Sequence, residues 1–317
     1  MSQPLCPDAD FISLVRQHGC AETGKRLGMT ERSVHQRRAR IEKRHGIQIP
    51  SPSILNTRKA DEHPGRVCID VQDGIVLVGG DGHYWPGPAS TAHRAFVQFC
   101  RKLKPQVVVM NGDAFDGAKI SRHPPIGWEN RPDVVDELAA VQQRLGEIEK
   151  AAPKARKVWP LGNHDARLET RLATVAPEYA RIHGFHLKDH IPNWESCWSC
   201  WVNGDVVIKH RGPKGGVHAT HNNTVAAGRS MVTGHLHSLK VTPYTDYNGT
   251  RYGVDTGTLA SPDWPQFRDY TESNPLNWRS GFAVLTFHEG RLMQPELAQV
   301  WSEEEGLIEF RGNVHAV

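Results

Sequence analysis

The sequence of 317 residues predicts a layered α/β sandwich preceded by a small all-α domain. Short runs rich in valine and isoleucine, typical of buried strands, alternate with segments of helical periodicity after about residue 69. The first 50 residues show helical patterns instead, and they carry a basic surplus. We therefore expect a helical domain at 1–50, a linker at 51–68 and a larger α/β domain at 69–317.

The N-terminal segment has the pattern of a helix-turn-helix. An amphipathic helix that contains Phe11 should stop at Gly19, and a short second helix is expected at 21–27. Thr30 can cap a third helix that runs to about Arg44. The third helix should bury its apolar residues and expose its basic ones.

This segment is similar to the helix-turn-helix DNA-binding family, in which the third helix enters the major groove. The resemblance is carried by the run from Ala21 to Val34, with Gly28 in the turn. By that resemblance the candidate DNA-contacting residues are Arg32, Ser33, Gln36, Arg37 and Arg40. Residues 1–50 hold nine basic and five acidic side chains, whereas the whole chain has a net charge of +3. A protein-docking role for the same basic helices is the alternative interpretation.

The linker and the later elements follow from local patterns. Residues 50–53 alternate proline and serine, and the polar stretch 56–65 follows, which is typical of an extended linker. Helices are expected at 90–103 and 132–151. Hairpins are expected around Asn203-Gly204 and Asn248-Gly249, and strands at 282–287 and after Gly290 are expected to complete a second sheet.

Five polar clusters each follow an apolar run at the point where a strand should end. The clusters are Asp81-Gly82-His83, Gly112–Asp116, Gly162–Asp165, His210 and Gly234–His237. Because buried strands deliver side chains from their carboxyl ends, we expect one site to collect them all. Two divalent cations about 3.5–4 Å apart need a bridging carboxylate, imidazoles and open positions, and these clusters supply such donors.

The ordered clusters resemble those of the calcineurin-like metallophosphoesterase superfamily, over roughly residues 75–240. The resemblance implies a calcineurin-like fold of two mixed sheets flanked by helices, and a first metal held by Asp81, His83, Asp113 and His237. It implies a second metal held by Asp113, Asn163, His210 and His235, with Asp113 as the bridge. By the same resemblance His164 faces the substrate as a general acid, and Asp116 orients it.

The metals implied are two divalent transition ions, with manganese the first choice and iron, zinc or nickel as alternatives. Imidazole donors suit these metals better than magnesium or calcium. Candidate substrate contacts are Arg122, His123 and Arg131 in the loop 119–131, and Arg167 and Arg211 elsewhere. Arg211 is a departure, since many relatives have glycine directly after the histidine. Asn277-Trp278 resembles a motif that packs the last sheet in relatives.

Composition sets limits on the remaining possibilities. No apolar stretch approaches the roughly 18–20 residues that span a bilayer, and the N-terminus lacks a leader pattern, so we expect a soluble, cytoplasmic protein without a membrane partner. Cys197 and Cys200 have Cys-x-x-Cys spacing, but they lie in a predicted strand and lack a second pair. The sequence indicates no oligomeric state.

Three functions agree with the sequence. The first is a phosphodiesterase or nuclease that acts on DNA or is recruited to it by residues 1–50. The second is a phosphomonoesterase or small-molecule phosphodiesterase that the N-terminal domain merely localises. The third is a non-enzymatic DNA-binding protein that keeps the metal fold as a scaffold. The loops around the metal ligands decide among these three functions. Their sequences do not by themselves reveal the phosphoester substrate.

Overall fold

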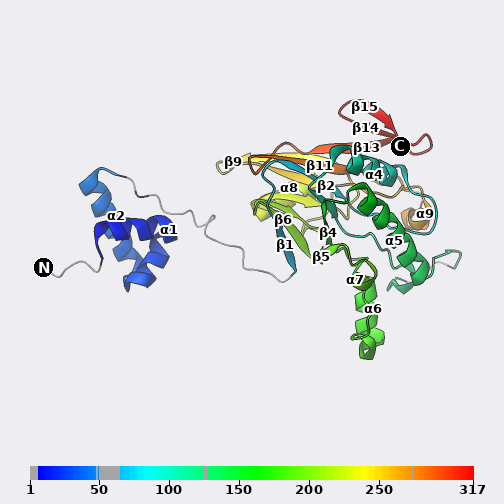
Figure 1. The fold of residues 1–317 in the computed structure, drawn as a ribbon, viewed down its shortest axis with the longest axis horizontal. Coiled ribbons are helices and arrows are strands. Elements are labelled where there is room, and N and C mark those ends of the chain that lie inside the picture. Colours follow the sequence, from blue (N-terminus) through cyan, green and yellow to red (C-terminus); the bar gives the residue numbers. More distant parts are fainter. Residues whose placement is uncertain (1–5, 48, 50–64, 124–126, 273) are drawn as a thin grey trace. The chain divides into compact units, whose positions relative to one another are not determined.

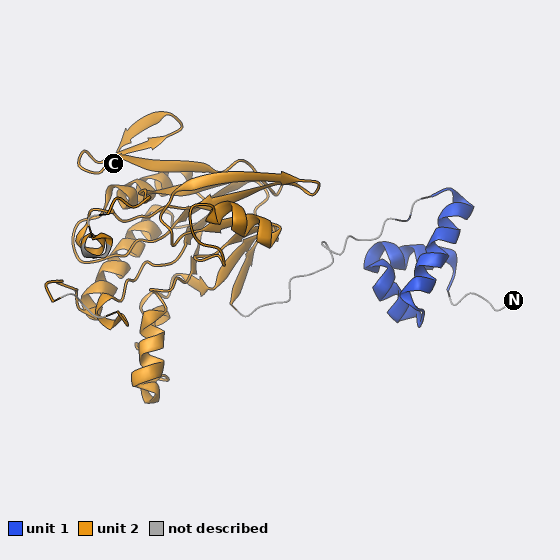
Figure 2. Ribbon diagram, turned by 180° about the vertical axis from the view of Figure 1, so that it is seen from behind, with its two compact units in different colours: residues 1–64 blue, residues 65–317 orange. Residues whose placement is uncertain are grey.

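The computed structural model describes residues 6–47, 49, 65–123, 127–272 and 274–317 (Figure 1). The chain divides into two compact units, residues 1–64 and 65–317 (Figure 2). Most of the expected linker, residues 51–64, lies outside the described residues. Its last part differs from expectation, because β1 (Arg66–Ile69) is a strand that pairs with β6 of the second unit.

The first unit consists of α1 (Asp8–Leu27) and α2 (Glu31–His45). The backbone of Gly19 has φ 74° inside α1, so the helix is kinked where the sequence predicts a stop. The Thr30 side chain accepts a hydrogen bond from the backbone N–H of Ser33 and caps α2, as expected. A small core with Phe11 and Val15 on one side and Val34 and Ile41 on the other joins the two helices.

Arg37 does not point to solvent as the sequence analysis assumed. Its guanidinium donates to the Asp8 carboxylate at 3.0 Å and to the Cys6 carbonyl at 2.7 Å, and it lies 4.4 Å from the centre of the Phe11 ring. These contacts tie α2 to the start of α1, so Arg37 is a structural residue here. Arg32, Gln36 and Arg40 are exposed, as a nucleic-acid contact requires.

The second unit is built on two mixed sheets, which confirms the α/β fold class. The larger sheet has the order β15-β14-β13-β11-β2-β3-β4-β5, with β12 beside β11. Its strands are β2 (Gly74–Gly79), β3 (Val107–Met110), β4 (Arg156–Pro160), β5 (Glu195–Cys197), β11 (Gly281–His288), β12 (Arg291–Leu292), β13 (Glu296–Ser302), β14 (Leu307–Phe310) and β15 (Asn313–Ala316). β2 to β5 are parallel neighbours, whereas β11 runs antiparallel to β2.

The smaller sheet has the order β1-β6-β7-β8-β10-β9. Besides β1 it contains β6 (Ser199–Val202), β7 (Val206–Ile208), β8 (Ser230–Thr233), β9 (Lys240–Asp246) and β10 (Gly249–Asp255). The two predicted hairpins are present as the antiparallel pairs β6–β7 and β9–β10. The strands after residue 280 were assigned to this sheet from sequence, and that assignment is wrong, since β11 pairs with β2 of the larger sheet.

Two helices, α4 (Thr91–Leu103) and α5 (Val134–Ala151), pack on the larger sheet, and α8 (Ala219–Ala227) packs on the smaller one. The helix α6 (Arg167–Val175) projects away from the sheets (Figure 1). The other helices are α7 (Leu187–His190) and α9 (Pro265–Thr271), with short 3-10 turns η1 (Ala118–Ile120) and η2 (Pro177–Tyr179). The predicted helices at 90–103 and 132–151 correspond to α4 and α5.

Two hydrophobic cores hold the layers together. In the first, Leu77 and Val108 of the larger sheet pack with Phe96 of α4 and Leu145 of α5. In the second, valines on the opposite face of the same strands pack against the smaller sheet. Side chains alternate between the two faces of the sheet along β2 and β3. Both faces are apolar because helices cover one of them and the smaller sheet covers the other. Within the described residues, no helix is long and apolar enough to cross a membrane.

Candidate metal centre

The five polar clusters all follow strands, as the sequence predicts, but the strands belong to two different sheets. β2, β3 and β4 of the larger sheet end just before the clusters at Asp81, Asp113 and Asn163. β7 and β8 of the smaller sheet end just before His210 and His235. The candidate centre therefore lies where the carboxyl ends of these strands come together, and both sheets contribute side chains.

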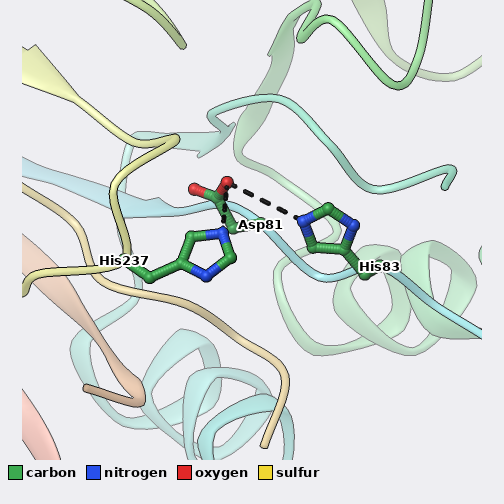
Figure 3. Close-up of side chains that lie close together, drawn as sticks. All are labelled: Asp81, His83 and His237. Atoms are coloured by element: carbon green, nitrogen blue, oxygen red, sulfur yellow. Dashed lines mark hydrogen bonds and ion pairs between the residues drawn. The ribbon is translucent and has the colours of Figure 1, made fainter. Parts of the chain in front are cut away.

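The first group consists of Asp81, His83 and His237, all buried, whose candidate ligand atoms lie within 4.8 Å of one another (Figure 3). His237 Nε2 is 3.0 Å from Asp81 Oδ1, and His83 Nε2 is 4.0 Å from the same oxygen. The backbone N–H of His235 donates to both Asp81 oxygens and fixes the carboxylate. One carboxylate and two imidazoles thus converge on one point.

The second group consists of Asp113, His210 and His235. His210 Nε2 lies 3.0 Å from Asp113 Oδ2, and the His210 and His235 rings are 5.3 Å apart. His210 Nδ1 is 2.9 Å from the Asn111 carbonyl oxygen, which accepts a hydrogen bond when this nitrogen is protonated and leaves Nε2 as a donor to a metal. Asp113 belongs to this group; its predicted role as the bridge to the first metal stays a prediction.

Several atoms of the predicted ligands are buried without a hydrogen-bond partner in the described part of the chain. They include His83 Nε2, Asn163 Oδ1 and His210 Nε2, which is near Asp113 but not aligned for a hydrogen bond. Buried polar atoms are rarely left without a partner, because the desolvation cost is then uncompensated. Each of these atoms is a candidate ligand, so the residues present fit a pair of divalent cations.

The electrostatics of the second group also fit a cation. Burial alone would lower the pKa of His210, but the carboxylates of Asp113 and Asp81 raise it to about 10. Burial would raise the pKa of Asp113, yet His210 holds it well below its usual value. Two buried carboxylates thus create a negative potential that attracts a proton, and a divalent cation would compete for the same place.

Glycines make room for the ligands of neighbouring loops. A Cβ on Gly162 would lie 2.0 Å from Asp113 Oδ1, and one on Gly234 would lie 2.4 Å from Asp81 Oδ2. A Cβ on Gly112, whose φ is 81°, would lie 2.4 Å from His210 Nδ1. Glycine at these positions therefore leaves space for the side chains of the candidate ligands.

The candidate ligands hold an uncommon backbone conformation. Asp81, His83, Asp113, His235 and His237 have φ values of 52°, 39°, 50°, 71° and 53°. Residues with a Cβ rarely adopt this left-handed region, which costs on the order of 1–3 kcal/mol each when the surroundings impose it. Such strain gathers at functional sites because it orients side chains that regular strands would point elsewhere.

His164 and Asp116 form a pair beside the two groups, and with His83 they make a third set whose candidate ligand atoms lie within 4.8 Å of one another. His164 Nδ1 lies 2.5 Å from Asp116 Oδ1, and His164 Nε2 lies 3.9 Å from Asp113 Oδ2. The Asp116 carboxylate also accepts from Trp85 Nε1 at 2.9 Å. Burial opposes ionisation of Asp116, but the hydrogen bonds from His164 and His83 hold its pKa well below its usual value. The predicted orienting contact is therefore present, and Asp116 additionally lies 3.4 Å from His83 Nδ1.

Among the proposed substrate contacts, the structure brings Arg167 to the site. Arg167 donates to the Asp116 carbonyl at 2.8 Å, and its NH2 group is 3.2 Å from His164 Nε2. Arg211 is exposed and lines a cavity next to His235. Arg122 and His123 are exposed and make no contact with the centre among the described residues, and residues 124–126 lie outside the description. Arg131 is paired with Glu129 instead.

Sequence analysis missed two supports of the centre. Asp165 is buried and accepts hydrogen bonds from the backbone N–H groups of Asp113, Phe115 and Gly162, which fixes the loops that carry the ligands. Its position in the Gly-Asn-His-Asp cluster was the available signal. Burial, and then the charge of Asp113, raises the pKa of Asp165 to about 7.

The second missed support is aromatic. The Trp278 ring lies 4.5 Å from the His237 ring, and the Phe267 ring of α9 lies 5.1 Å from His83 and 5.2 Å from Trp278. Trp278 therefore contacts a candidate ligand, whereas the sequence analysis assigned it to packing of the last sheet. Ring packing of this kind restricts the rotation of both imidazoles.

The cysteines do not contribute to the centre. Cys197 and Cys200 are buried in the core between the sheets. Burial raises the pKa of Cys197 to about 12 and that of Cys200 further, so both thiols stay protonated. Both are strand residues, but the expectation of a single strand is wrong: Cys197 ends β5 of the larger sheet and Cys200 lies in β6 of the smaller one.

Comparison with known proteins gives limited further information. Neither a protein-family model nor a curated protein sequence matches this chain. Among solved structures, it is similar to a zinc complex of Vps29 from Entamoeba histolytica, with 14% identity and a TM-score of 0.36 over 76% of this chain and 96% of that one. It is also similar to the phosphoesterase YfcE from E. coli, with 14% identity and a TM-score of 0.34 over 70% of this chain and 97% of that one. A dimetal phosphatase from Danio rerio matches with 11% identity and a TM-score of 0.38 over 72% of this chain and 96% of that one. At these TM-scores the likenesses carry no functional argument, which rests on the geometry above.

Proposed function

We propose that this protein is a dinuclear-metal-dependent phosphoester hydrolase. The observation that carries the proposal is the convergence of two Asp/His groups, one per metal, in which His83 Nε2 and His210 Nε2 are buried without hydrogen-bond partners among the described residues. Two ions held in this way supply Lewis acidity to phosphoryl oxygens and lower the pKa of water. The donor set of imidazoles, carboxylates and one amide favours manganese, with iron, zinc or nickel as alternatives.

The residues beside the metals have separate tasks in this proposal. His164 is partly exposed and oriented by Asp116, so it can give a proton to the oxygen that leaves phosphorus. Burial opposes protonation of His164, but Asp116 and Asp113 raise its pKa, which favours the form that donates. Arg167 places its guanidinium next to the same imidazole, where it can contact a phosphoryl oxygen.

The proposal is tested by metal content and hydrolysis measured together. The full chain, purified without chelator and supplied with Mn²⁺, should hold about two equivalents and hydrolyse bis(4-nitrophenyl) phosphate, a small phosphodiester. Removal of the metal with a chelator should abolish turnover, and Mn²⁺ should restore it. A protein that binds two metals but hydrolyses neither this diester nor 4-nitrophenyl phosphate would favour the non-enzymatic scaffold.

We infer that the substrate is DNA or is reached through DNA. The exposed side of α2 supports this, because Arg32, Gln36, Arg40 and Lys43 all face solvent there. A phosphodiesterase or nuclease then follows from joining this helix to the hydrolase. The alternative is a phosphomonoesterase or small-molecule phosphodiesterase for which the first unit provides localisation alone.

Charge removal on the two helices separates these alternatives. The pair Arg32→Gln and Lys43→Gln on α2 should weaken binding to duplex DNA at low salt. The slope of log affinity against log salt concentration should also become shallower by about 0.9 for each phosphate contact that is lost. The matched pair Arg16→Gln and Lys25→Gln removes the same charge from exposed positions of α1 and should change binding much less. Equal effects of the two pairs, or an affinity independent of salt, would favour the protein-docking role.

A further inference from the structure

A cavity of about 400 Å³ lies beside the second metal group. One wall is the loop from Arg211 to Gly215, and the other is formed by Gly234, His235 and Leu236. His235 is a candidate metal ligand, so the cavity borders the centre directly. Its volume falls in the range of about 300–1,000 Å³ that is common for ligand pockets.

The charged side chains that line this cavity, apart from the candidate ligand His235, are both cationic. Residues 206–245, which carry the last two clusters, contain lysines and arginines but no aspartate or glutamate. Arg229 of this segment is paired with Asp205, and Lys240 contacts the Val217 carbonyl oxygen. Arg211 and Lys214 line the cavity and have no acidic partner among the described residues. Two cationic side chains are thus available to an anion in this cavity.

The loop that presents these cations is held in place. The Asn223 side chain of α8, which is buried, accepts from the Lys214 backbone N–H at 2.9 Å and donates to the Lys214 carbonyl at 3.0 Å. Gly212 lies so close that a Cβ there would be 2.5 Å from the Asn223 amide. The loop has glycine at position 212 because a side chain there would clash with Asn223. No such clash restricts position 211, which carries an arginine.

Arg211 is close to the candidate centre, because Arg211 and the candidate ligand His235 line the same cavity. A cation in this place can contact a phosphate group next to one bound at the centre. The guanidinium fork of arginine and the ammonium of lysine are the side chains that proteins use to bind phosphate.

We propose that this cavity binds a second phosphate of the substrate, adjacent to the one that is hydrolysed. The inference rests on the proposed hydrolase function and specifies its substrate class: a phosphoester that carries at least two phosphates. A nucleic-acid strand and a free nucleoside diphosphate both offer this chemistry. The scissile phosphate occupies the metal centre, while Arg211 and Lys214 bind its neighbour.

Short thymidine nucleotides test the proposal, because they differ by one phosphate. TpT has a single phosphodiester, whereas pTpT and TpTp add a terminal phosphate on one side or the other. The Mn²⁺-loaded full chain should show a kcat/KM on the order of tenfold higher for pTpT or TpTp than for TpT, mainly through KM. AMP and ADP, used as competitive inhibitors of TpT hydrolysis because the terminal bond of ADP is an anhydride and not an ester, provide the comparison for a free nucleotide, so a preference in one series identifies the source of the phosphate.

Variants connect the preference to the cavity. Arg211→Gln and Lys214→Gln should each reduce the preference for the second phosphate, and Asn223→Ala should reduce it by releasing the loop. Arg101→Gln and Lys154→Gln are matched controls, since both positions are exposed near the amino ends of β3 and β4, away from the centre, and should keep it. Metal content is measured for every variant, so that a lost ion is not mistaken for a lost phosphate contact.

The outcomes separate this inference from the proposed function. A wild-type protein that binds metal and hydrolyses bis(4-nitrophenyl) phosphate, but shows no preference in either nucleotide series, would overturn the inference and leave the hydrolase intact. A preference that Arg211→Gln and Lys214→Gln both retain would also overturn it. A protein that hydrolyses no ester would contradict the proposed function itself.

Discussion

Replacing Asp113 by asparagine is expected to remove at least one metal ion and nearly all turnover. The carboxylate accepts from the His164 backbone N–H at 2.8 Å and lies 3.0 Å from His210 Nε2. An amide of the same shape keeps the volume but loses the negative charge that two imidazoles and a cation require. Metal affinity should therefore fall by more than the roughly 10–100-fold that loss of an outer contact costs. Elemental analysis and turnover of bis(4-nitrophenyl) phosphate measure the two effects.

Asp205→Asn is the matched control for this change. Asp205 is exposed and paired with Arg229, and it lies at the amino end of β7, opposite to the end that carries His210. This variant should keep both metals and normal turnover. If Asp113→Asn kept two equivalents of metal, the assignment of Asp113 as a ligand would be wrong.

The second large effect is expected for His164→Ala. The imidazole is positioned by Asp116 and lies next to Arg167; its atoms are close enough to His83 and Asp116 to form a third candidate group, but we assign it to the general acid and not to a metal. The variant should retain near-normal metal content while kcat falls by about 10²–10⁴, the usual contribution of a positioned general acid. A diester with a better leaving group should be affected less, because its oxygen needs little protonation.

His183→Ala provides the comparison for this variant. His183 is exposed after α6 and outside the centre, so its loss should change neither metal content nor kcat. Loss of a stoichiometric ion from His164→Ala would show that His164 is a ligand. Asp116→Asn should reduce kcat because His164 loses its orienting contact. It should also weaken metal binding, because Asp116 lies near His83 Nδ1 as well.

The candidate metal clusters could be predicted because each follows a strand that can be recognised from its local sequence pattern. The valine runs of β2 and β3 have apolar side chains on both faces, and the polar residues begin where those strands end. The order of strands within a sheet is not encoded so locally. β11 follows a run of strands from the smaller sheet in the sequence, yet it pairs with β2, more than 200 positions away. Pairing depends on which faces are covered, and no local pattern carries that information.

Residues that act through contacts with distant segments were equally difficult to foresee. Arg37 resembles every other arginine of the basic helix until α1 brings Asp8 and Phe11 beside it. Trp278 resembles a core residue until the chain returns it to His237. In both cases the side chain has a partner more than 20 positions away, so its neighbours in sequence contain no trace of its role.

The placement of the ligands on two sheets has a mechanical consequence. Asp81 and His237 are 156 positions apart, and they extend from different sheets toward the same candidate ion. A bound ion would therefore act as a cross-link that closes a very long loop of chain and restricts the unfolded state accordingly. Sliding of one sheet over the other by a fraction of an ångström would disturb both coordination shells at once. The valine-rich contact between the sheets thus sets the geometry of the candidate centre, and bound ions would in return resist separation of the layers.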